Sequence, residues 1–215
     1  MTTEQSCAPN HHAHYPGFAG PAGLLAATSM VLGGEGNARL AEHLSELVTS
    51  DAVADIGCGP GTAARRAARA GATVVGVDPA PVMLRVARLL TRRSAHAVRY
   101  AEGSAEALPL PDSSVSVAWS IASVHHWADL DKGLHEARRV LKPGGRLVAI
   151  ERLTRPGTTG LASHGWTPEQ ARAFADRCLA HGFTDARVNR HGSGRRTKVS
   201  VTAIAPIRPD GSGQP

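Results

Sequence analysis

A short apolar segment runs straight into a glycine-rich turn at residues 53–62, whose sequence is VADIGCGPGT. Glycines at alternate positions let the backbone turn sharply and approach a ligand closely. The residues that follow Thr62 favour a helix, and a helix N-terminus attracts negative charge. The segment therefore predicts a buried strand, a turn that binds a nucleotide-type cofactor, and a helix.

The rest of the chain alternates between short apolar segments and amphipathic segments. The periodicity predicts strands at 52–56, 73–77, 98–101, 115–120, 146–150, 186–190 and 199–204. It predicts helices at 36–49, 62–70, 81–91, 129–141 and 167–181. Residues 191–194 can join the last two strands as a hairpin. We therefore expect an α/β fold with a doubly wound, mostly parallel seven-stranded sheet and a C-terminal antiparallel hairpin strand.

The length of 215 residues and the hydrophobic share of 42% suit one globular domain. We expect a flexible arm or lid at 1–23, a single domain at 24–205 and a disordered tail at 206–215. No apolar run approaches the roughly 18–20 residues of a membrane span, and residues 1–16 lack the pattern of a secretory signal. These features predict a cytoplasmic protein without a membrane span.

The net charge of +6 raises the question of a nucleic-acid partner. Basic side chains gather at residues 185–198, but most arginines of the first half lie on predicted helices, whose outer faces are polar in any case. The chain also lacks an Asn-Pro-Pro-Tyr type motif after the fourth predicted strand and an added target-recognition domain. A small-molecule partner is therefore expected, and a nucleic-acid partner is disfavoured.

Two acidic residues flank the glycine turn. Asp78 ends the second predicted strand, where doubly wound folds use an acidic side chain to accept hydrogen bonds from two ribose hydroxyls. Asp55 precedes the glycines and suits a ligand that carries a cationic ammonium or sulfonium group. Thr62 stands where the dinucleotide fingerprint has its third glycine, so an NAD-dependent oxidoreductase is the least favoured reading.

This segment resembles the class I S-adenosylmethionine-dependent methyltransferases, in the small-molecule subgroup similar to the ubiquinone/menaquinone methyltransferases. Three further segments follow in the family's order. Residues 101–112 resemble its adenine-side loop, residues 123–127 its motif after the fourth strand, and residues 138–147 its turn into the fifth strand. The resemblance covers roughly residues 50–150 and implies a Rossmann-like methyltransferase fold with S-adenosylmethionine as cofactor and S-adenosylhomocysteine as product.

The resemblance also implies which residues bind the cofactor. They are Asp55, Gly57, Cys58 and Gly59 around the methionine moiety, Asp78 at the ribose, Pro79 and Met83 beside the adenine, Ser104 and Ala105 at the adenine edge, and Ser120 and Ile121 beside the donated methyl. Ser104 stands where the family usually has Asp, which weakens the expected hydrogen bond to the adenine amino group. Cys58 can equally be no more than a small buried side chain.

The implied reaction is a direct displacement in which an acceptor attacks the methyl group, and a hydroxyl acceptor must also lose its proton. A neutral imidazole suits that task, so we expect His125 first and His164 second as catalytic residues. Only 4% of the chain is aromatic, which favours a polar hydroxyl acceptor over a flat quinol. Quinol C-methylation, methylation of RNA or another nucleic acid, and a noncatalytic cofactor-binding regulator remain as alternatives.

Three histidines of the arm, His11, His12 and His14, invite a metal site. A loose arm offers no preorganised ligand set, so the sequence predicts no metal. Short loops leave little chain to cover the acceptor, so the arm, the loop at 157–165 or a second subunit must close the pocket. A homodimer is one expectation.

Overall fold

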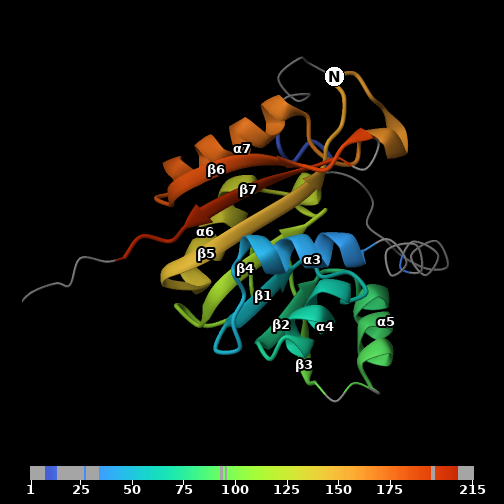
Figure 1. Cartoon of the computed structure of the whole chain (residues 1–215), viewed down its shortest axis with the longest axis vertical. Coiled ribbons are helices and arrows are strands. Elements are labelled where there is room, and N and C mark those ends of the chain that lie inside the picture. The colour runs from blue at the N-terminus through green and yellow to red at the C-terminus, as the bar shows by residue number, and fades with distance from the viewer. Residues whose placement is uncertain are drawn as a thin grey trace, which may run out of the picture.

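The computed structural model describes residues 8–13, 27, 34–92, 94, 96–194 and 197–207, and it contains a seven-stranded sheet of order β3-β2-β1-β4-β5-β7-β6 (Figure 1). The strands are β1 (Ala52–Ile56), β2 (Thr73–Asp78), β3 (Val98–Glu102), β4 (Val115–Ile121), β5 (Leu141–Arg152), β6 (Thr184–His191) and β7 (Lys198–Ile204). The first five are parallel, whereas β7 pairs antiparallel with both β5 and β6. The predicted fold class is confirmed.

Helices cover both faces of this sheet, as Figure 1 shows with α3 in front of the strands and α6 behind them. The α-helices are α3 (Glu35–Leu44), α4 (Thr62–Arg69), α5 (Pro81–Thr91), α6 (Leu130–Val140) and α7 (Pro168–Ala180). Two short 3-10 turns, η1 (Val124–His126) and η2 (Gly160–Ser163), follow β4 and β5. Each of these turns lies in a loop at the carboxyl ends of the parallel strands.

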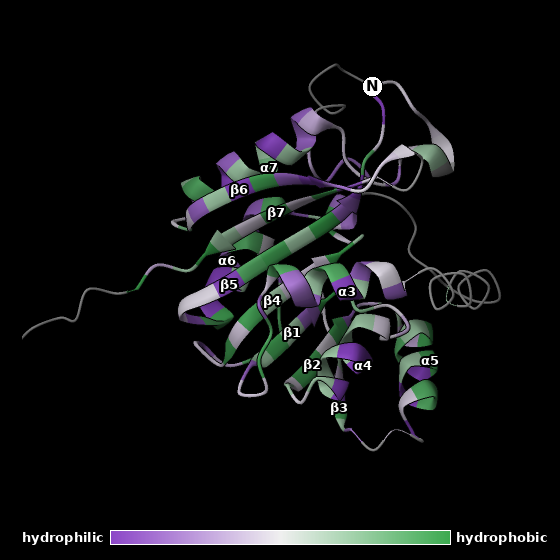
Figure 2. Ribbon diagram, in the orientation of Figure 1, coloured by the Kyte–Doolittle hydropathy of each residue, from purple (hydrophilic) through white to green (hydrophobic). Residues whose placement is uncertain are grey.

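Alternate residues of the central strands pack in two separate hydrophobic cores, one on each face of the sheet. In β1, Val53 packs in the core under α3 and α4, whereas its neighbour Ala54 packs in the core under α6 and α7. The period of two in a strand produces this division. Both neighbours are buried, which explains why most residues of the central strands are hydrophobic (Figure 2).

Two element boundaries differ from the sequence-based expectation by five residues, and the other differences are of one or two residues. The helix predicted at 36–49 ends at Leu44, because Glu46 adopts a positive φ of 47° that a helix cannot continue. Residues 142–145 were expected to separate helix and strand, yet they lie within β5 as an irregular stretch. The Gly144 amide donates to the Ala205 carbonyl, and the Ala205 amide donates to the Gly145 carbonyl, each at 2.8 Å. These two backbone hydrogen bonds tie the stretch to Ala205.

The described part of the predicted arm, residues 8–13, is tied to loops at the carboxyl edge of the sheet. The His12 amide donates to the His125 carbonyl at 2.8 Å, and the Trp166 indole donates to the Pro9 carbonyl at 2.8 Å. Asn10 donates to the carbonyl of Trp127 at 3.0 Å. Most of the predicted arm and nearly all of the predicted tail fall outside the described residues. Within the described chain, none of the helices has the length and apolar character to cross a membrane.

Candidate functional site

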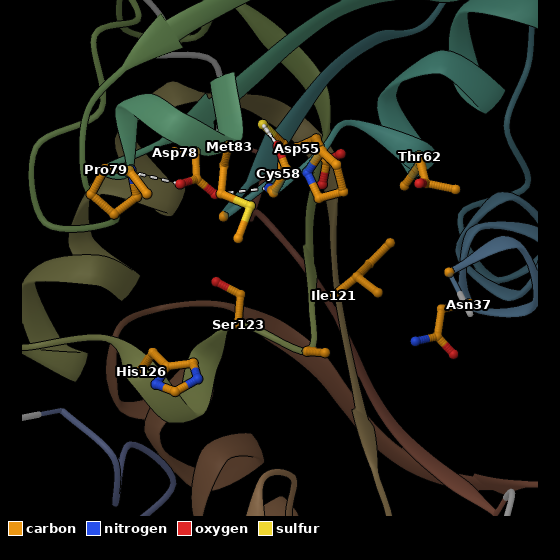
Figure 3. A pocket seen from close by; sticks show the side chains of 17 residues that line it. Asn37, Asp55, Cys58, Thr62, Asp78, Pro79, Met83, Ile121, Ser123 and His126 are labelled. Atoms are coloured by element: carbon orange, nitrogen blue, oxygen red, sulfur yellow. Dashed lines mark hydrogen bonds between the residues drawn. The ribbon is translucent and has the colours of Figure 1, made fainter. Parts of the chain in front are cut away.

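A cavity of about 370 Å³ opens at the carboxyl ends of β1, β2 and β4 (Figure 3). The strand order reverses between β1 and β4, and doubly wound sheets bind ligands at such a reversal. The volume falls within the range of small-molecule pockets. Its lining comes from the start of α3 and the three strand-end loops: Gly34, Asn37, Asp55, Gly57, Cys58, Gly59, Pro60, Thr62, Ala63, Asp78, Pro79, Ala80, Met83, Ile121, Ala122, Ser123 and His126.

The glycine turn after β1 lines this cavity and leaves no space for a side chain at Gly57 or at Gly61. Gly57 has a φ of 72°, and a Cβ there would lie 2.0 Å from the Ser123 Oγ. Gly61 has a φ of 75°, and a Cβ there would lie 2.3 Å from the Tyr100 hydroxyl. Both positions therefore require glycine for conformation and for space. The turn in this way exposes its backbone to a ligand.

Asp78 lies at the end of β2 and connects the turn to the next helix. Its carboxylate accepts hydrogen bonds from the Gly59 amide at 2.8 Å and from the Ala80 amide at 2.9 Å. Burial raises the pKa of Asp78, and these two amide bonds oppose the rise. A carboxylate has about four lone-pair positions, so this one can accept further hydrogen bonds from ligand hydroxyls.

Asp55 is buried at the end of β1, and its Oδ2 atom has no hydrogen-bond partner among the described residues. Burial is the main cause that raises the pKa of Asp55 to about 7; a bond from the Ala64 amide opposes the rise, and the charge of Asp78 adds to it. A buried carboxylate is costly unless an opposite charge comes close. The pocket therefore suits a ligand that brings a cationic group to Asp55.

Eight of the cofactor-binding residues predicted from sequence line the cavity: Asp55, Gly57, Cys58, Gly59, Asp78, Pro79, Met83 and Ile121. The other three lie outside this lining. Ser104 forms a bridge with Ala107, Ala105 packs in a hydrophobic core, and Ser120 is fully buried within β4. Their contact with a cofactor stays a prediction.

Asn37 and His126 line the cavity although the sequence analysis did not select them. Asn37 comes from α3, which precedes β1 in the chain, and its position depends on how that helix packs across the sheet. For His126 a signal was present, because it stands beside His125 after the fourth strand. Sequence order favoured His125, but the structure places His126 at the wall and His125 outside the lining.

Five histidine rings gather beside this wall, from residues 8–13, η1 and the loop after β5, and the ring centroid of His11 lies 4.5 Å from that of His12. The ring centroid of His125 lies 4.1 Å from that of His126, 5.4 Å from that of His164 and 5.8 Å from that of His12. The predicted catalytic residues His125 and His164 therefore come together, although neither lines the cavity. We call His12, His125, His126 and His164 the histidine cluster.

Glu151, the residue before the last of β5, orients the most buried ring of the histidine cluster. Both carboxylate oxygens of Glu151 lie 2.9 Å from the Nδ1 atom of His125, and both side chains are almost fully buried. A carboxylate at Nδ1 fixes the tautomer that carries its proton there. The Nε2 atom of His125 is buried and has no hydrogen-bond partner among the described residues. It presents a lone pair within the cluster.

The other rings of the cluster are neutral at neutral pH. Burial is the largest cause that lowers the pKa of His126 to about 3 and that of His164 to about 4. Burial and the neighbouring His11 also lower the pKa of His12. Neutral imidazoles can accept a proton or bind a metal ion.

Residues 54–149 match a family model described as a methyltransferase domain. Over 81 residues the chain is 44% identical to the demethylmenaquinone methyltransferase of Thermus thermophilus. This alignment covers 38% of this chain and 37% of that protein. Over 128 residues it is 37% identical to the malonyl-(acyl-carrier protein) O-methyltransferase of Pseudescherichia vulneris. This alignment covers 60% of this chain and 49% of that protein.

Among solved structures, the phosphoethanolamine N-methyltransferase 2 of Haemonchus contortus superposes with a TM-score of 0.71 over 93% of this chain and 60% of that chain. At 19% identity, this likeness shows the fold. The chain spans only 37–46% of the length of the demethylmenaquinone methyltransferases that it matches. The comparisons agree on the part of the chain that builds the cavity.

Proposed function

Because the chain contains a domain of the class I S-adenosylmethionine-dependent methyltransferases, we propose that it transfers a methyl group to a hydroxyl oxygen of a small-molecule acceptor. The cofactor of the family is S-adenosylmethionine, and the residues of the cavity fit it. The unpartnered Asp55 oxygen suits a cationic group, and the Asp78 carboxylate suits ribose hydroxyls. The observation that carries the choice of a hydroxyl acceptor is the His125–Glu151 pair beside the cavity.

Bound S-adenosylmethionine supplies a methyl group on a sulfonium and leaves as the neutral thioether S-adenosylhomocysteine. The acceptor oxygen forms a bond to the methyl carbon as the carbon–sulfur bond breaks, and the electron pair of that bond stays on sulfur. The hydroxyl proton passes to the Nε2 atom of His125, while the Nδ1 proton stays on the ring and is donated in a hydrogen bond to Glu151. The carboxylate stabilises the imidazolium that forms, as in other oriented histidine bases. His164 is the second candidate for this role.

We further propose that residues 8–13 belong to a lid over the acceptor. Their hydrogen bonds to the His125 carbonyl and to the Trp166 indole support this role, because both partners lie at the carboxyl edge of the sheet. A lid that excludes water would favour methyl transfer to the acceptor. The shortness of the links that follow β4 and β5 also supports a homodimer whose second subunit completes the wall. A cytoplasmic location belongs to the same proposal.

C-methylation of a quinol is the second candidate, and the demethylmenaquinone methyltransferase of Thermus thermophilus supports it by similarity. The positions of Trp127 and Trp166, two large aromatic side chains that could hold a flat ring, argue against it. Both are buried, with exposed fractions of 4% and 0%, and Trp166 packs against Phe174 in the core. They are not in position to clamp a ring in the cavity.

A screen with methyl-labelled donor tests the acceptor class. The full chain is offered phenolic and sugar hydroxyls, carboxylates, quinols and RNA, and transferred label is measured for each. We expect label on a hydroxyl acceptor. Label on a quinol or on RNA and none on hydroxyl compounds would overturn the proposal, and label on no acceptor would favour a noncatalytic binding protein.

The replacement Asp78→Ala should weaken the binding of S-adenosylmethionine by about 1–3 kcal/mol, because hydrogen bonds between a carboxylate and the ribose are lost. Calorimetry measures the affinity for S-adenosylmethionine, S-adenosylhomocysteine and NAD. The parent protein should bind the first two more tightly than NAD. Asp176→Asn, an exposed carboxylate on α7, serves as the control and should bind as the parent does. Binding of NAD alone by the parent would contradict the assignment of the cavity.

A further inference from the structure

The histidine cluster has a feature that proton transfer alone does not require. His125, His126 and His164 each offer a ring nitrogen, and these three atoms all lie within 4.8 Å of one another. They come from two separate loops, η1 and the segment that follows β5. Tertiary packing, and not a local turn, therefore brings three nitrogen ligands to one point.

The surroundings of His125 match those of a histidine that ligates a metal. Such a histidine almost always donates its second ring nitrogen to a carboxylate or carbonyl, which fixes the ring and raises the basicity of the ligating nitrogen. Here Nδ1 bonds Glu151 at 2.9 Å, and the buried Nε2 has no hydrogen-bond partner among the described residues. Glu151 also supplies a negative charge close to the point where a cation would lie.

The charges around the three rings also suit a cation. Arg152 is exposed, and its Nε donates to the backbone carbonyl of His164 at 3.1 Å. The charge that faces the cluster from within the protein is that of Glu151.

We propose that His125, His126 and His164 hold one divalent transition-metal ion beside the methyl-donor cavity. Imidazole ligands suit Zn²⁺, Cu²⁺, Ni²⁺ and Fe²⁺ and discriminate against Mg²⁺ and Ca²⁺, which prefer oxygen. Three protein nitrogens with a fourth position open to solvent or substrate are typical of catalytic zinc sites. At zinc–nitrogen distances of about 2.0–2.1 Å, the nitrogens would lie roughly 3.4 Å apart, so the rings need to close by about 1 Å or a little more.

His126 both belongs to this site and lines the donor cavity, so the ion would lie beside the wall of that cavity. An acceptor hydroxyl in the fourth position would lose its proton more readily, as water does on zinc. The ion would then promote loss of the hydroxyl proton, the task that a free imidazole performs when no ion is bound. This role rests on the proposed function, whereas the site itself rests on the side chains alone.

Metal binding is tested on the full chain, produced without a polyhistidine tag and stripped with chelator. Co²⁺ is titrated in and followed by its visible absorption, which reports nitrogen ligation, and elemental analysis after Zn²⁺ loading and dialysis gives the stoichiometry. We expect one ion per chain. His126→Ala and His164→Ala should each weaken Co²⁺ binding at least about tenfold, and Glu151→Gln by about 10–100-fold.

The matched control is His135→Ala, which removes an exposed histidine of α6 and should leave Co²⁺ affinity unchanged. His126 and His164 are only partly buried, so their variants keep the test valid if Glu151→Gln does not fold. The absence of a nitrogen-type Co²⁺ spectrum, or equal affinity in His126→Ala and in the parent, would overturn the site. Because neither readout needs an acceptor, failure to methylate hydroxyl compounds would remove the proposed function and leave the metal site standing.

Discussion

Replacement of His125 by alanine should lower kcat for a hydroxyl acceptor by about 10²–10⁴-fold, the range attributed to general acid–base catalysis. Donor affinity should change little, because His125 does not line the donor cavity. The two effects are separated by measuring turnover with labelled donor and donor binding by calorimetry. A site that only packs this ring would lose stability instead of turnover.

The alanine variant also leaves Glu151 buried without its partner, so stability needs a control. His125→Asn keeps an amide N–H that can donate to Glu151 but removes the basic nitrogen. It should fold as the parent does and still lose turnover, while His135→Ala should keep both. Full turnover in His125→Asn would show that the acceptor needs no base, as expected of a carboxylate acceptor.

The part of the cavity around the glycine turn was predictable because its signals are local. Gly57, Gly59 and Asp55 lie next to one another in sequence, and Asp78 ends the next strand, so the parallel sheet brings them together without further information. Backbone geometry explains the pattern: a positive φ and the closeness of Ser123 leave glycine as the residue that fits at position 57.

The histidine side of the site was only half predictable. Glu151 is 26 residues from His125, and nothing in the linear order pairs them. A signal did exist, since Glu151 falls at the carboxyl end of the fifth strand, the edge where such sheets bind ligands. The strand predicted from sequence ends at residue 150, one residue before Glu151. The choice between His125 and His126 depends on how η1 turns its side chains, which sequence order cannot express.

The arm shows how tertiary contacts can replace missing local order. A loose arm by itself offers no preorganised ligand set, so the sequence predicts no metal at His11 and His12. In the structure the Nε2 atom of His11 bonds the backbone carbonyl of Ser163 at 2.9 Å. The Nε2 atom of His12 bonds the hydroxyl of the same serine at 3.1 Å. His12 also stacks on His164 with 4.4 Å between ring centroids. Preorganisation comes from the loop after β5, which the arm's own sequence does not contain.

The replacement Asp55→Asn should produce two opposite effects, weaker donor binding and higher stability at alkaline pH. The donor brings a cation toward the unpartnered Oδ2 atom, so loss of the carboxylate charge should weaken binding by about 1.5–3 kcal/mol, or roughly 10–150-fold. In the parent, S-adenosylmethionine should bind more tightly as the pH rises through 7, because binding requires the ionised carboxylate. In Asp55→Asn this pH dependence should disappear.

The stability effect follows from the same pKa. The folded protein holds the Asp55 proton up to about pH 7, whereas the unfolded chain releases it near its ordinary value of 3.8. The folded state therefore binds more protons within that window, and the stability of the parent falls as pH rises through it. Asparagine carries no charge to bury, so Asp55→Asn should melt above the parent at pH 8, with a smaller difference at pH 5.

Thermal melts at pH 5 and pH 8 test the stability effect, and calorimetry with S-adenosylmethionine and S-adenosylhomocysteine tests the binding effect. Asp176→Asn serves as the surface control. S-adenosylhomocysteine lacks the sulfonium charge but keeps the ammonium. Equal weakening for S-adenosylmethionine and S-adenosylhomocysteine would assign Asp55 to the ammonium, and weakening for S-adenosylmethionine alone would assign it to the sulfonium. Unchanged affinity for both, or a lower melting temperature at pH 8, would show that the buried carboxylate serves the fold and not the donor.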